Sequence, residues 1–186
     1  MAEKKKILTK VKKISFTPWN ETGTGLESAS VILNDIVADS VAITQDDPEK
    51  SQIDCETRDE PIIESVTQGK YQVTMDSANI GYDVLETCMG FKKIGSSETL
   101  AAAAPADYVE KYVRIDIEMA DGVFLLPRVL LTSKIDASSL KTNVAKGTLS
   151  GTAYSANVTV GEESSPVMTP FLIVNPGVSV AVQALA

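Results

Sequence analysis

The strongest constraint on the fold is a period-two alternation of apolar and polar residues. The clearest case is 112–119, where every second residue is apolar and most residues between them are charged. Successive side chains of a strand point to opposite faces, so this pattern predicts a strand with one buried and one solvated face. Seven further segments are predicted to be strands: 41–44, 51–57, 71–75, 123–131, 148–154, 171–174 and 178–184. The chain is therefore predicted to be mainly β.

Glycine and proline mark turns between these strands and one irregularity within them. An Asp-Gly pair precedes the strand 123–131, and Asn-Pro-Gly at 175–177 separates the last two predicted strands. Such sequences are typical of turns, so we expect the last two strands to form a hairpin. Proline cannot donate a hydrogen bond to a neighbouring strand, and Pro127 therefore predicts a bulge or an edge position.

One segment, 78–89, has helical spacing. Ser77 or Asn79 is available as its N-cap, and Gly90 is placed to end it. We expect one helix of about three turns that packs its apolar stripe against a sheet. The apolar residues of this stripe are Ile80, Val84, Leu85, Cys88 and Met89.

A second, weaker helical run is predicted beside Pro105. It covers either 99–104 or 106–111. Its alanines are equally compatible with a loop, so both interpretations stay open.

The composition fits one globular domain that lacks the commonest catalytic side chain. The 186 residues are 44% hydrophobic, which is enough for a single core. The chain has no histidine, which excludes Ser-His triads and histidine-based zinc sites. Cys55 and Cys88 have no metal-ligand spacing; we expect two small buried residues, with a single bridge between them as the alternative. No enzymatic activity, cofactor or metal is expected.

Charge is distributed unevenly along the chain. Residues 1–13 carry six lysines and one glutamate and are predicted to form a flexible basic segment. Residues 14–186 are predicted to form a single domain; its 11 basic and 24 acidic residues give −13, and the whole chain carries −8. Its most acidic part, 45–61, is predicted to be a long loop or hairpin. A field of this sign repels phosphates, so no specific nucleic-acid binding is expected.

Neither a secretory leader nor a membrane span is expected. The apolar run at 7–11 is too short and too charged for a leader. No segment approaches the roughly 18–20 apolar residues that span a bilayer. We therefore expect no membrane partner.

Three weaker signals have plain interpretations. Gly-Thr-Gly at 23–25 lacks the third glycine of a dinucleotide loop and is predicted to be a turn. The acidic segment lacks the spacing of a calcium loop. A carboxylate hydrolase for sugars would need an aromatic-lined cleft, and Trp19 is the sole tryptophan. We expect Trp19 to be a core or interface anchor.

Two predicted strands, 51–57 and 71–75, are each expected to carry a solvated, mostly acidic face. The simplest interpretation is the solvent side of a sheet. The alternative is the wall of a conduit through which a polyanion slides, because like charges leave no binding sites along it. The candidate channel-lining residues are Asp54, Glu56, Gln72 and Thr74.

Taken together, three stretches resemble the phage major tail tube proteins, the subunits that stack as rings to form long phage tails. The stretches are ISFTPWNETGTG at 14–25, the acidic segment with the predicted helix at 35–90, and the strand-rich segment at 113–156. In that family, similar sequence covers a strand, an acidic long loop or hairpin, a strand pair and a helix on the sheet.

The resemblance implies a β-sandwich or barrel-type tail tube fold with one flanking helix, assembled as hexameric rings around a channel. The chain would be a virion protein, assembled in the host cytoplasm, through which DNA passes during ejection. Its partners would be further copies of itself, a tail tip or baseplate initiator, a tail terminator and a tape-measure protein. The segment 45–61 resembles a loop that bridges subunits or rings, and the contact candidates there are Asp46, Asp47, Glu49 and Lys50.

Two other functions remain open on sequence alone. The inner tube of a contractile injection system has the same fold, and nothing in the sequence separates it from a phage tail tube. A monomeric β-sandwich module that binds a ligand through its loops belongs to another class. The scarcity of aromatic residues counts against the binding module.

Overall fold

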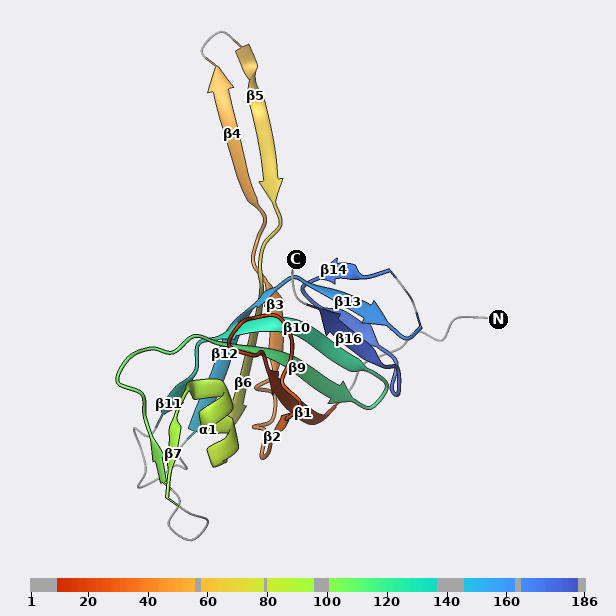
Figure 1. Ribbon diagram of the computed structural model, residues 1–186. Helices are drawn as coiled ribbons and strands as arrows, with labels where there is room; N and C mark the ends of the chain where they lie inside the picture. The colour runs from red at the N-terminus through yellow and green to blue at the C-terminus, as the bar shows by residue number, and fades with distance from the viewer. Residues whose placement is uncertain are drawn as a thin grey trace.

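The computed structural model describes residues 10–55, 58–78, 80–95, 101–136, 146–162 and 165–183. The described chain is mainly β with one short helix, as the alternation predicts (Figure 1). Each of the eight segments predicted as strands contains a strand. Within the described residues, none of the helices is long and apolar enough to cross a membrane.

Nine strands of the described chain form one antiparallel main sheet. Seven lie side by side in the order β2 (Val31–Leu33), β1 (Val11–Pro18), β9 (Lys111–Met119), β10 (Val123–Leu131), β12 (Lys146–Tyr154), β6 (Tyr71–Ser77) and β3 (Ala42–Gln45). Two short strands join at the side: β11 (Lys134–Asp136) pairs with β12, and β15 (Leu172–Val174) pairs with β10.

Three smaller sheets accompany the main sheet. The C-terminal sheet has the order β14 (Val167–Thr169), β13 (Ala156–Val160) and β16 (Val180–Gln183). The other two small sheets have two strands each: β4 (Glu49–Cys55) pairs with β5 (Arg58–Thr67), and β7 (Lys92–Ile94) pairs with β8 (Ala101–Ala103).

The hydrophobic core lies on one face of the main sheet, where α1 (Tyr82–Met89) packs against β1, β2 and β9. The structure confirms the alternation predicted for β9: Val113, Ile115 and Ile117 are buried, and the residues between them are not. Because β1 and β12 carry the same pattern, neighbouring strands bury their apolar residues on the same face. Val84 and Cys88 of α1 are also part of this core.

The helix is shorter than expected, and its cap was predicted wrongly. It begins at Tyr82 with Gly81 as the N-cap, and no side chain caps it. Ser77 cannot cap it, because Ser77 ends β6 and its buried hydroxyl donates to the Asn34 carbonyl oxygen at 2.7 Å; Asn79 lies outside the described residues. Gly90 ends the helix as predicted, in the left-handed conformation at φ 70°.

Cys88 is a free thiol, so it forms no bridge with Cys55. Burial raises its pKa, because the thiolate would have to leave water. Cys88 is therefore a small apolar core residue, as predicted. The side chain of Cys55 lies outside the described residues.

One alternative and one further expectation are wrong. Of the two interpretations of the segment beside Pro105, the helical one is wrong: 101–103 forms β8, and 104–110 has no helix or strand, while 99 and 100 lie outside the described residues. The last two strands do not form a hairpin. The turn at 175–177 is present, but β15 pairs with β10 while β16 pairs with β13, so the chain crosses there from the main sheet to the C-terminal sheet.

Pro127 marks a bulge, one of its two predicted alternatives, and the bulge lies in a central strand. Pro127 and Arg128 of β10 together stand opposite Arg114 of β9, since the register shifts between Leu126 and Val129. The other edge of β10 pairs with β15 before the bulge and with β12 after it. The bulge therefore lies where β10 changes partner.

Replacing Gly151 of β12 by alanine is expected to destabilise the protein by about 1–3 kcal/mol, the usual cost of overpacking. A Cβ there would lie 2.6 Å from Cγ1 of Val129 and 2.7 Å from the carbonyl oxygen of Leu130. Urea unfolding followed by tryptophan fluorescence measures the change. Gly25→Ala is the control, because the nearest atom would lie 3.9 Å from a Cβ there. Equal stability of Gly151→Ala and the wild type would contradict the close packing of β12 on β10.

Candidate functional site

The acidic segment leads into a long hairpin that stands away from the rest of the molecule (Figure 1). Within the described residues, β4 and β5 pair with each other and with no other strand. Four residues predicted as subunit contacts lie at its start and are exposed: Asp46, Asp47, Glu49 and Lys50. The structure thus brings the four contact candidates together where the hairpin leaves the body.

The base of the hairpin is held by hydrogen bonds to two backbone carbonyl oxygens. The Asp46 N–H donates to the Lys70 carbonyl oxygen at 2.9 Å, and the side-chain amide of Gln45 donates to the Gly69 carbonyl oxygen at 3.3 Å. Only glycine fits at position 69, because a Cβ there would lie 1.7 Å from the carbonyl oxygen of Asp46. The two chains leaving the body are therefore in direct contact at the base.

The predicted channel-lining residues are divided between two sheets. Gln72 and Thr74 lie on β6 of the main sheet, on the face opposite the core, because Val73 and Met75 between them are buried. Asp54 lies in β4 of the hairpin, so it does not share a sheet with them. Glu56 lies outside the described residues.

Around Gln72 and Thr74 the outer face of the main sheet is built from hydroxyl and amide side chains. The amide of Gln72 donates to a carboxylate oxygen of Asp46 at 3.0 Å, and its carbonyl oxygen accepts from the Thr152 hydroxyl at 2.9 Å. Ser150 is the register partner of Thr74 and donates its hydroxyl to the Thr132 carbonyl oxygen at 2.6 Å. We call this surface the polar face; its uncharged members are Thr44, Gln72, Thr74, Thr132, Thr148, Ser150 and Thr152. Asp76 and Lys134, the two register partners of Thr148, add one carboxylate and one ammonium group to it.

Sequence analysis found only Gln72 and Thr74 of the polar face. The missed β12 residues had a visible signal, since Thr148, Ser150 and Thr152 alternate with Leu149, Gly151 and Ala153. What the sequence could not supply was the pairing of β12 with β6, which puts the two polar rows side by side. The face that results is more neutral than the acidic face expected.

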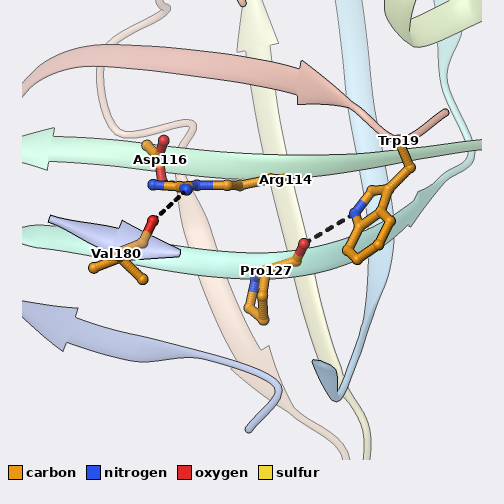
Figure 2. Close-up of polar contacts among 5 residues, drawn as sticks. All are labelled: Trp19, Arg114, Asp116, Pro127 and Val180. Carbon is orange, nitrogen blue, oxygen red and sulfur yellow. Dashed lines mark hydrogen bonds and ion pairs between the residues drawn. The ribbon is translucent and has the colours of Figure 1, made fainter. Parts of the chain in front are cut away.

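A second candidate site lies at the bulge of β10. Trp19 is 7% exposed, and its indole N–H donates to the Pro127 carbonyl oxygen at 3.0 Å (Figure 2). The guanidinium of Arg128 lies 4.5 Å from the ring centre of Tyr112 and 5.7 Å from that of Trp19. These three residues line a cavity of about 510 Å³, together with Glu27, Glu86, Glu110, Lys111 and the turn at 20–23. The cation–π contacts fix Arg128 against the wall of this cavity.

The turn beside this cavity confirms the interpretation of the Gly-Thr-Gly motif. The side-chain oxygen of Asn20 accepts from the backbone N–H of Thr24 at 2.9 Å, and Gly23 has a positive φ of 67°. Such an arrangement is a local turn closed by an asparagine side chain.

Arg114 connects the main sheet to the C-terminal sheet. Its Nε donates to a carboxylate oxygen of Asp116 at 2.9 Å, and Nη1 donates to the Val180 carbonyl oxygen at 3.0 Å (Figure 2). Both side chains are largely shielded from solvent. This contact is structural: it attaches β16 to the outer face of β9.

Comparisons with known proteins add no functional assignment. A scan against protein-family models and a search of the curated proteins found no match for this chain. In the described part of the chain, no cluster of three or more acidic or thiol side chains is arranged to hold a metal ion.

Gly69→Ala is expected to disturb the hairpin base without affecting the core. The Asp46 backbone must move, and the hydrogen bond between Gln72 and Asp46 is lost with it. Amide NMR spectra should shift at residues 45–51 and 65–72, while β9 resonances stay in place. Gly25→Ala is the control, because its nearest atom would lie 3.9 Å from the new Cβ. Unshifted hairpin resonances in Gly69→Ala would contradict the contact at the base.

Proposed function

We propose that this protein is a structural subunit that assembles with copies of itself into stacked rings, forming the tube of a phage tail. The observation that carries the proposal is the β4–β5 hairpin. A lone two-stranded hairpin is marginally stable in water, and no other strand of the described chain supports this one. A second protein surface against the hairpin would stabilise it, and in a homo-oligomer that surface belongs to another copy.

The ends of the main sheet support ring formation. β2 and β3 are its terminal strands, so each leaves one edge without a partner strand in the described chain. Exposed strand edges invite pairing with another chain. If β2 of one copy met β3 of the next, the contact would be heterologous and would close into a ring when the rotation allows. The expected hexamer is such a ring.

The polar face fits the wall of a DNA channel. Its hydroxyl and amide groups are engaged with one another, as in the contacts of Gln72 with Asp46 and Thr152. A wall with few cations offers little counter-charge for phosphates to bind. On the proposed assembly, DNA passes along this face without specific binding, and the protein resides in the virion tail. The inner tube of a contractile injection system would use the same features for a protein cargo.

A ligand-binding module is the second candidate, and one observation favours it. The cavity at Trp19, Tyr112 and Arg128 combines two aromatic rings with a cation, which is the composition of many small-ligand sites. This candidate leaves the β4–β5 hairpin without a role, so we place it second.

The test is negative-stain electron microscopy with sedimentation velocity over a range of protein concentrations. The wild type is expected to form rings or hollow tubes with a regular axial repeat. A variant with residues 49–67 replaced by a short Gly-Ser linker should keep its Trp19 fluorescence, because Trp19 lies in the body, but should stay monomeric. A wild type that remains monomeric at high concentration, or a shortened variant that still forms tubes, would overturn the proposal.

A further inference from the structure

The two terminal strands of the main sheet carry no charged residue. β2 has the sequence Val-Ile-Leu and β3 has the sequence Ala-Ile-Thr-Gln, in a chain of which 23% of the residues are charged. Proteins commonly place lysines or other charges on terminal strands, because an unpaired edge invites another chain. Neither β2 nor β3 has such a charge on the edge that it leaves unpaired within the described chain.

The side chains of the two terminal strands also match in face. Val31 of β2 is the register partner of Phe16, and Ile43 of β3 is the register partner of Val73. Phe16 and Val73 are buried in the core, and Val31 and Ile43 are partly buried against it. A sheet that continued from β3 of one copy into β2 of the next would therefore keep apolar side chains on its core face.

The direction of such a junction follows from the strand order. Seven strands form the path from β2 to β3, and every neighbouring pair along it is antiparallel. Strand directions therefore alternate, and the first and seventh strands run the same way. Copies in a ring are related by rotation, so β3 of one copy would meet β2 of the next as a parallel pair.

There is space for a strand beside β2. A cavity of about 580 Å³ lies between β2 and α1, and Val31 and Ile32 line it from the β2 side. Asp83 and Glu86 line it from α1, and both carboxylates pair with Lys93, which neutralises part of their charge. An incoming strand without charged side chains suits this space, because it brings no further carboxylate to it.

We infer that β3 of a second copy occupies the space beside β2 as a parallel strand, with its Ile43 side chain on the α1 side of the sheet. The inference deepens the proposed function and rests on it, since it assigns the direction and the surfaces of the junction between neighbouring copies. The contact joins two different edges, so it repeats from copy to copy. A twofold contact between two β2 strands would instead stop at two copies.

Cross-linking between two different cysteine variants tests this junction. Ile32→Cys marks β2 and Ala42→Cys marks β3; both positions are exposed and lie on the face opposite the core. Both variants also carry Cys55→Ser, and Cys88 is buried and stays unreactive in the folded protein. The control replaces Ala42→Cys by Ala181→Cys, an exposed alanine on β16 of the C-terminal sheet. Because the two cysteines are on different chains, every mixed product joins two copies.

In tubes assembled from equal amounts of two variants, a short bismaleimide should give 32–42 products at least about tenfold more efficiently than 32–181 products, because neighbouring thiols react at a high effective concentration. Tubes without this excess, or with mainly 32–32 products, would overturn the junction and leave the tube function standing. A wild type that does not assemble would overturn the proposed function and this inference together.

A matched pair of charge substitutions tests the same edge without cysteines. Ile32 of β2 is 43% exposed, and Ile94 of β7, which lies outside the main sheet, is 53% exposed. Ile32→Lys should raise the protein concentration needed for assembly at least about tenfold, because a charge on a terminal strand blocks pairing; Ile94→Lys should leave it unchanged. Sedimentation velocity measures this concentration, and unchanged Trp19 fluorescence shows that both variants fold. Assembly of Ile32→Lys at the wild-type concentration would overturn the inference.

Discussion

The fold depends on which strands pair with the two edges of β10. One edge pairs with β9 along most of the strand; the other pairs first with β15 and then with β12. Pro127 lies between these two sets of partners, where the strand has an extra residue and a proline sacrifices no ladder donor. The carbonyl oxygen freed at Pro127 accepts the Trp19 indole N–H, so the end of β1 is fixed to the same point. The C-terminal sheet joins the main sheet through this arrangement and through Arg114.

Against that well-connected body, the β4–β5 hairpin is the exception. The strands of the main sheet share a buried core with α1, whereas the hairpin leaves the body at Asp46 and Gly69 and pairs with no other strand among the described residues. Isolated hairpins gain little from burial, so the conformation of this one should depend on a partner surface. In the proposed assembly, another copy of the chain supplies that surface.

Sequence reasoning located the strands whose alternation is strict and missed those whose pattern is diluted. The alternation of β9 and β12 is strict, and both were predicted as strands. β1 carries lysines at 12 and 13, which interrupt the pattern, and it was not identified by alternation. The helix end at Gly90 and the strand bulge at Pro127 were also predicted correctly, because each follows from the backbone geometry of a single residue. Long-range pairing could not be deduced: the turn at 175–177 was visible, but not that β15 and β16 join different sheets. The same limit separated Asp54 from Gln72 and hid the partners of Gln72 on β12.

The central claim is that the hairpin is stabilised by a second copy, and amide hydrogen exchange tests it most directly. Backbone amides of β4 and β5 should exchange rapidly in dilute protein and at least about tenfold more slowly at concentrations where the protein assembles, because docking closes the open state. Amides of β9, in the centre of the main sheet, should be protected equally in both samples. Hairpin amides that are already as protected as those of β9 in dilute protein, or that stay unprotected after assembly, would contradict the claim.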